Sequence, residues 1–193
     1  IIDLDGTTLP RNWHQISEEN RKALEEAGRQ GVVRILATGR SVFSLNNTLP
    51  EGLPVDYMVF SSGAGIMHWE DKEILLTREL SAEETLEIAT HLWKYDINFT
   101  IQQRIPDNHH FYYRNISSLH EDFRRRIENY PGLGTPISST DEIRGGATQF
   151  LVILDAQQLQ LHGDIQQKLS TYSVIRSTSP IDNQAIWTEV FAP

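Results

Sequence analysis

The sequence contains no cysteine among its 193 residues. Disulfide frameworks and zinc sites built on thiolates are therefore excluded. No apolar run approaches the roughly 20 residues that a membrane-spanning helix needs. The opening residues, Ile1-Ile2-Asp3, also lack the basic region and long apolar stretch of a signal peptide. We therefore expect a cytoplasmic protein with no membrane partner.

Basic residues are scarce as well. The chain has 17 Lys and Arg against 26 Asp and Glu, which gives a net charge of −9. Proteins that bind nucleic acid need clustered cations, so no nucleic-acid partner is expected. The one basic run, Arg124-Arg125-Arg126, lies in a predicted helix between Asp122 and Glu128. A solvated helix face is the favoured interpretation of this run over an anion site. We expect a monomer or a weak homodimer.

Strands and helices alternate over the first 60 residues. Ser17 is predicted to be a helix N-cap, with Glu18 and Glu19 in the first turn of the helix that follows it. Alternation of this kind predicts βαβ units and a parallel sheet with right-handed crossovers. The predicted strands cover residues 1–2, 32–37 and 55–60, and the predicted helices run from residue 17 to 28–31 and over 41–49.

The pattern changes after residue 61. Two apolar runs joined by Glu70-Asp71-Lys72 predict a β-hairpin over 66–69 and 73–76. Residues 131–136 are predicted to be a loop. Predicted helices cover 81–95, 116–130 and 156–169, and predicted strands cover 97–102, 111–114, 149–154, 172–176 and 185–190. This mixed block is long enough, at roughly 110 residues, to be a domain of its own.

Polar residues follow each of the first three strands. Asp3 and Asp5 follow the first, Thr38-Gly39-Arg40 the second, and Ser62-Gly63 the third. In an open α/β sheet, ligands bind beyond the carboxyl ends of the strands. The three segments therefore predict one site at one edge of the sheet.

The spacing of Asp3 and Asp5 suits phosphate chemistry. Two nearby carboxylates can hold Mg²⁺, which takes oxygen ligands and keeps several waters. An ionised aspartate can attack phosphorus without a base, and a second carboxyl can protonate the leaving oxygen. Gly6 lets the backbone approach phosphate oxygens. Two simpler interpretations stay open: a turn in which both acids bond backbone amides, and Thr38 or Ser41 acting only as a helix cap.

Three segments resemble the haloacid dehalogenase-like phosphatases of the Cof-type subfamily. They read DLDGTTL from Asp3, LATGR ending at Arg40, and FSSGAGI from Phe60. The resemblance implies an α/β fold, with a Rossmann-like parallel-sheet core and an inserted α+β cap of the C2 type. Residues 1–79 would form the first part of the core, 80–190 the cap, and 191–193 the start of the return to the core.

The same resemblance implies roles for individual residues. Asp3 would be the nucleophile and a metal ligand. Asp5 would be the general acid and base, and its backbone carbonyl would bind Mg²⁺. The residues that would bind phosphate are Leu4, Gly6, Thr38 and Gly39, and those that would face substrate are Arg40, Ser62 and Gly63. Ser62 stands where the subfamily usually has asparagine.

The sequence therefore predicts a Mg²⁺-dependent phosphomonoesterase of small phosphorylated metabolites, most readily sugar phosphates. A phosphomutase of the same superfamily and a non-catalytic phosphometabolite-binding module remain alternatives. In this family a lysine and a pair of acids that complete the site follow the cap, and no residue of the sequence matches them. Because the opening strand is short and three strands make a small core, we expect the rest of that core to follow Pro193.

Overall fold

The computed structural model describes residues 1–10, 15–114, 116, 120–179 and 184–193. It divides into two compact units, which are Ile1–Arg78 and Glu79–Pro193. The assignment of these units to a phosphatase core and its cap remains a prediction. Among the residues described, no helix has both the length and the apolar character needed to cross a membrane.

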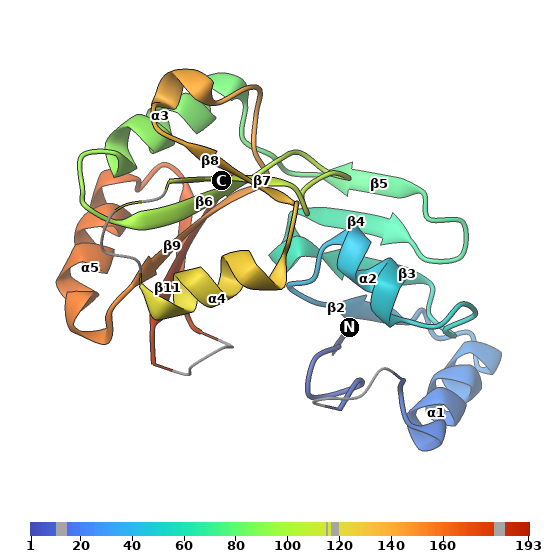
Figure 1. Cartoon of the computed structure of the whole chain (residues 1–193). Coiled ribbons are helices and arrows are strands. Elements are labelled where there is room, and N and C mark those ends of the chain that lie inside the picture. Colours follow the sequence, from blue (N-terminus) through green and yellow to red (C-terminus); the bar gives the residue numbers. More distant parts are fainter. Residues whose placement is uncertain (11–14, 115, 117–119, 180–183) are drawn as a thin grey trace. The chain divides into compact units, whose positions relative to one another are not determined.

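Unit 1 (Ile1–Arg78) is built on a five-stranded sheet in the order β1-β2-β3-β4-β5 (Figure 1). β1, β2 and β3 are parallel, as the alternating pattern predicts, and β4 and β5 extend the sheet as an antiparallel hairpin. The strands are β1 (Ile2–Asp3), β2 (Ile35–Ala37), β3 (Tyr57–Phe60), β4 (Gly65–His68) and β5 (Ile74–Thr77). The helices are α1 (Glu18–Arg29), α2 (Val42–Thr48) and the 3-10 turn η1 (Ser61–Gly63).

Both helices of unit 1 begin where the sequence predicts. The Ser17 side chain accepts a hydrogen bond from Asn20 N, and Ser41 caps α2 in the same way through Ser44 N. β2 is shorter than predicted. Val32 and Val33, expected within that strand, are 53% and 60% exposed and precede it. Apolar sequence alone therefore overestimated the buried part of this strand.

An ion pair fixes the entry to β2 and β3. The guanidinium of Arg34 donates from Nε and Nη2 to the two oxygens of Asp56, at 3.0 and 2.7 Å. The backbone N–H of Arg34 also donates to Asp56 Oδ2 at 2.7 Å. A fork of this geometry is among the stronger ion pairs in proteins. It holds together the two segments that enter the central strands.

Unit 2 (Glu79–Pro193) contains a six-stranded sheet in the order β10-β11-β9-β6-β7-β8. Its strands are β6 (Asn98–Gln102), β7 (Phe111–Arg114), β8 (Gly134–Ile137), β9 (Gln149–Leu154), β10 (Ser173–Thr178) and β11 (Ile186–Phe191). Its helices are α3 (Ala82–Leu92), α4 (Glu121–Asn129) and α5 (Leu159–Lys168), with the 3-10 turns η2 (Thr140–Glu142) and η3 (Ala156–Gln158). Part of the predicted helix over 116–130 lies outside the described residues.

The helices of unit 2 cover opposite faces of its sheet (Figure 1). Ile88 of α3 and Ile165 of α5 belong to the larger apolar core, together with Phe150 of β9. Phe123 of α4 packs in a smaller cluster that includes Trp187. β9 contributes to both clusters, which explains why its sequence is apolar on both faces.

The prediction of a loop over 131–136 is wrong in its second half. Residues Gly134–Ile137 form β8, which pairs in parallel with β7. The strand lies at the edge of the sheet, where a proline such as Pro136 is tolerated because one side of an edge strand needs no ladder hydrogen bonds. Glycine and proline therefore concealed a genuine edge strand.

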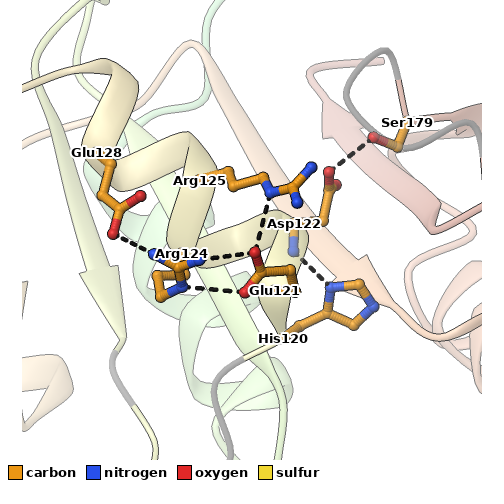
Figure 2. A network of polar contacts seen from close by, with 7 residues as sticks. All are labelled: His120, Glu121, Asp122, Arg124, Arg125, Glu128 and Ser179. Atoms are coloured by element: carbon orange, nitrogen blue, oxygen red, sulfur yellow. Dashed lines mark hydrogen bonds and ion pairs between the residues drawn. The ribbon is translucent and has the colours of Figure 1, made fainter.

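The basic run in α4 divides into two environments. Arg124 and Arg125 form ion pairs with Glu121 and lie half-exposed on the solvent side (Figure 2). The solvated-face interpretation is correct for these two residues. It is wrong for Arg126, whose buried Nε has no hydrogen-bond partner within the described residues. The Arg126 guanidinium lies 5.3 Å from the ring centroid of Trp187.

Candidate functional site

The carboxyl ends of β1, β2 and β3 bring the three predicted segments together. Asp3 pairs in register with Ala37, and Ala37 with Val59. Each segment therefore leaves the sheet at the same level, because parallel strands end on the same edge. The backbone joins them further, since Thr38 N donates to Val59 O at 2.9 Å and Ser62 N donates to Thr38 O at 3.1 Å.

Asp3 is exposed at the end of β1. Its Oδ2 accepts a hydrogen bond from Thr7 Oγ1 at 3.0 Å, and its backbone oxygen accepts one from Thr8 Oγ1 at 2.8 Å. Among the described residues, Oδ1 has no hydrogen-bond partner. The carboxylate is thus oriented by one oxygen and accessible through the other, which is the arrangement that a nucleophile needs.

Asp5 is held by the end of β2. Thr38 Oγ1 donates to Asp5 Oδ2 at 2.8 Å, and Arg40 Nε donates to Asp5 Oδ1 at 2.9 Å. Arg40 Nη2 also lies 2.7 Å from Oδ1, and Arg40 Nη1 donates to Thr48 Oγ1 at 2.9 Å. Both oxygens of Asp5 therefore accept hydrogen bonds. The simpler interpretation, in which Thr38 only caps a helix, is contradicted for this hydroxyl.

Leu4 and Gly6 shape the loop that carries the two acids. Leu4 is fully buried, and its N–H donates to Ala37 O at 3.0 Å. Gly6 has a φ of 80°, which favours glycine, and its N–H donates to Leu9 O at 2.8 Å. Both amides are engaged within the protein in this conformation. Phosphate binding by these two residues stays a prediction.

The third segment adopts an unusual backbone. Ser61, Ser62 and Gly63 have φ values of 50°, 55° and 96°, all in the left-handed region. Two consecutive non-glycine residues in this region mark strain that is often found at functional sites. The turn brings Ser62 beside Gly39, since a Cβ added at Gly39 would lie 3.4 Å from Ser62 Oγ. Substrate contacts for Ser62, Gly63 and Arg40 remain predictions.

Sequence reasoning missed two partners in this site. Thr7 orients Asp3, and the signal was present as the hydroxyl four residues after the acid. The ion pair between Arg40 and Asp5 spans 35 positions and gave no local signal. Arg40 was assigned to the substrate, whereas in this conformation it binds the second aspartate.

The donor chemistry of this edge fits Mg²⁺. The described residues contain no group of three or more histidine and acidic side chains arranged for a metal. Mg²⁺, however, is usually held by one or two carboxylates together with waters and substrate phosphate. The exposed carboxylate of Asp3 and the backbone carbonyl of Asp5 would supply such a partial set of hard oxygen ligands. No further protein ligand is identified within the described residues.

Comparisons with known proteins agree on one protein family. The sequence profile of the haloacid dehalogenase-like hydrolases matches residues 1–182. One similar curated protein is 5-amino-6-(5-phospho-D-ribitylamino)uracil phosphatase YcsE of Bacillus subtilis, 29% identical over 116 residues. That match covers 55% of this chain and 45% of YcsE, so the matched part is less than half of the relative's length.

Solved structures show the same fold. The phosphatase BT1666 from Bacteroides thetaiotaomicron matches 99% of this chain and 65% of its own, with a TM-score of 0.72 and 18% identity. The subclass IIB sugar phosphatase BT4131 matches 99% of this chain and 68% of its own, with a TM-score of 0.64 and 17% identity. At these identities the likeness establishes the architecture alone.

Proposed function

Because this chain belongs to the haloacid dehalogenase-like hydrolases, we propose that it is a Mg²⁺-dependent phosphomonoesterase that acts through an aspartyl-phosphate on Asp3. One observation carries the proposal. The second acid of the D-x-D pair, Asp5, is bound by Thr38 and Arg40 from the neighbouring strand end. The first acid, Asp3, remains exposed beside it.

The first chemical step is transfer of the phosphoryl group. An oxygen of Asp3 attacks phosphorus in line with the ester oxygen, so the Asp3–phosphorus bond forms as the ester bond breaks. The leaving alkoxide takes a proton from Asp5 and departs as an alcohol. In the conformation described, both oxygens of Asp5 accept hydrogen bonds. Arg40 therefore releases Asp5 when substrate binds, which lets Asp5 carry the proton.

The second step is hydrolysis of the acyl phosphate. Asp5, now a carboxylate, accepts a proton from water, and the water oxygen attacks phosphorus. The bond to Asp3 breaks, and inorganic phosphate leaves. The hydrogen bond from Thr38 Oγ1 to Asp5 Oδ2 suits Asp5 for this base role, because it orients the carboxylate while it is ionised. Thr7 holds Asp3 in place through its Oδ2 in both steps.

Asp3 and Asp5 would hold the Mg²⁺. When bound, the ion neutralises the charge of the phosphoryl group beside an anionic nucleophile. Sugar phosphates are the proposed substrates. The likeness to a structure described as a sugar phosphatase supports this choice, as does the phosphorylated ribityl compound in the name of YcsE.

Phosphate release from p-nitrophenyl phosphate tests the proposal, with the protein at its native length. We expect turnover to require Mg²⁺ and to be lost on chelation. Asp3→Asn should reduce turnover to background, and Asp5→Asn should reduce it by roughly 10²- to 10⁴-fold, the range for general acid–base groups. Asp71→Asn is the matched control, since Asp71 is an exposed acid that pairs with His68 in the β4–β5 hairpin.

Two outcomes would redirect the assignment. Full activity in Asp3→Asn contradicts the nucleophile. Binding of phosphate without turnover in any condition favours a non-catalytic phosphometabolite-binding module. Product analysis with hexose monophosphates separates the remaining alternative, because a phosphomutase yields an isomeric sugar phosphate instead of inorganic phosphate.

A further inference from the structure

The edge strand β5 presents an exposed apolar segment. Ile74, Leu75 and Leu76 are 37%, 49% and 45% exposed, and Thr77 is exposed as well. β5 is the last strand of the unit 1 sheet and pairs with β4 on one side. An apolar edge strand with unpaired peptide groups is a template for pairing with another strand.

A bulge sets which peptide groups face outward. Ile66 pairs with Leu76 and Met67 with Ile74, so Leu75 is the additional residue. Glu73 and Arg78 lie just outside β5, and their peptide groups face β4 and the residue before it. His68 N donates to Glu73 O, and Arg78 N donates to Ala64 O. Peptide groups alternate in direction along a strand. Ile74 and Thr77, next to those two residues, therefore turn their groups outward.

These outward groups define one symmetric register. If Ile74 of one copy lies opposite Thr77 of a second copy in an antiparallel pair, twofold symmetry repeats the same contact at the other end. Leu75 then lies opposite Leu76 across the axis. A closed twofold pairing of this kind is the commonest form of homo-oligomer.

The charges that flank β5 fit the same register. Glu73 precedes the strand, Arg78 follows it, and both are exposed. In the antiparallel register each Glu73 lies opposite the Arg78 of the second copy. Opposite charges facing each other across strands are favourable, whereas like charges are not. A parallel pairing would place Glu73 against Glu73 and Arg78 against Arg78, so the charges select the antiparallel form.

We propose that this chain forms a twofold homodimer through antiparallel pairing of β5 with β5 of a second copy. Four residues per copy bury far less than the roughly 1,200–2,000 Å² of a stable interface. The dimer is therefore weak and depends on concentration. The proposal is independent of the phosphatase assignment, since none of its residues belongs to the proposed site.

Sedimentation equilibrium over a range of concentrations tests the association. We expect Leu75→Glu to raise the dissociation constant of the dimer by at least about tenfold, because each introduced carboxylate faces Leu76 of the second copy beside the twofold axis. The matched control is Leu159→Glu, since Leu159 is also 49% exposed but begins α5. The control should associate as the native chain does. Equal weakening in both variants would contradict the proposal.

A charge swap tests the register. Glu73→Arg alone and Arg78→Glu alone should each weaken self-association, because each places like charges opposite one another. An equimolar mixture of the two variants should restore it, since every pair across the interface is then opposite in sign. Circular dichroism checks that both variants are folded. Failure of the folded variants to complement each other would overturn the register.

The absence of native cysteine allows a covalent test. In the double variant Ile74→Cys with Thr77→Cys, oxidation should form a disulfide-linked dimer, because facing residues lie about 5.5 Å apart at Cα and disulfides span that distance. Ile74→Cys alone faces a threonine and should stay largely uncrosslinked. A native chain that remains monomeric at every concentration, together with an uncrosslinked double variant, would refute the dimer.

Discussion

Asp122 offers a direct test of how unit 2 is stabilised. It is 1% exposed in the first turn of α4. Its Oδ1 accepts from Ser179 Oγ at 2.9 Å (Figure 2), and its Oδ2 accepts from Trp187 Nε1 at 2.6 Å. The carboxylate thus connects α4 to β11, which is 65 positions away in the sequence. We expect Asp122→Ala to destabilise this unit more than any surface change in α4.

The expected loss of stability in Asp122→Ala follows from the two donors, Trp187 Nε1 and Ser179 Oγ, that lose their acceptor. A buried donor left without a partner costs about 1–3 kcal/mol. The indole N–H can only donate, whereas the serine hydroxyl can rotate toward another acceptor. We therefore expect Asp122→Ala to cost about 3 kcal/mol in free energy of unfolding. Asp122→Asn should cost about 1 kcal/mol, because an amide can accept from Trp187 and donate to Ser179.

Glu121 supplies the matched control in the preceding position. It pairs with Arg124 and Arg125 on the exposed side of α4, and its side chain is 55% exposed. Exposed ion pairs contribute little to stability, so Glu121→Ala should destabilise the protein clearly less than Asp122→Ala. Urea unfolding followed by circular dichroism and tryptophan fluorescence measures both values.

A double-mutant cycle isolates the contact with the indole. Trp187→Phe removes the N–H and keeps most of the ring, so its cost should shrink once Asp122 is already alanine. Contacting residues show coupling of about 0.5–3 kcal/mol. Equal losses in Asp122→Ala and Glu121→Ala, or a cycle without coupling, would refute the view that this buried carboxylate stabilises α4 on the sheet.

Three further predictions concern pH and an ion pair. Hydrogen bonds from Arg34 lower the pKa of Asp56. The stability that they confer is therefore present above about pH 3.8 and is lost as pH falls through the pKa of the folded state. Asp56→Asn should remove about 1 kcal/mol of stability and reduce the loss of stability at acidic pH, as measured by urea unfolding. The hydrogen bond to Asp71 raises the pKa of His68 above 6.5, so its stabilisation is complete below 6.5 and is lost as pH rises through the folded value. NMR titration should show a raised His68 value that Asp71→Asn abolishes, and an unchanged titration in that variant contradicts the pair. Burial lowers the pKa of His162 below 6.5. Unit 2 should therefore lose stability as pH falls below about 6.5, because the unfolded chain then binds a proton that the folded chain does not bind. Urea unfolding at several pH values should show this loss, and His162→Gln should reduce it.

Local signals predicted the architecture well. Ser17, Ser41 and Ser81 each cap a helix as their side-chain chemistry predicts. Short apolar runs also predicted the β4–β5 hairpin and most strands of unit 2, such as β9, in which five of six residues are buried. The predicted site segments emerged at one sheet edge for the same reason, since parallel strands end together.

What the sequence did not reveal depends on partners that are distant along the chain. Two pairs of residues come into contact only in the folded chain, because they are far apart in sequence. They are Arg40 with Asp5 and Asp122 with Trp187. Arg126 looks like its neighbours in sequence, yet it lies on the inner side of α4. β8 was missed because it pairs at a sheet edge, where Pro136 breaks the usual composition of a strand.

The central place of β9 has a consequence for how the chain folds during synthesis. β9 lies between β6, which precedes it, and β11, which follows it, and five of its six residues are buried. It emerges from the ribosome with β6 already available, so one edge can pair at once. The other edge stays open until about 30 more residues have been made, and sheets with such distant pairings fold slowly. During that interval the uncharged segment Phe150-Leu151-Val152-Ile153-Leu154, which has the composition of an aggregation-prone strand, keeps one edge unpaired.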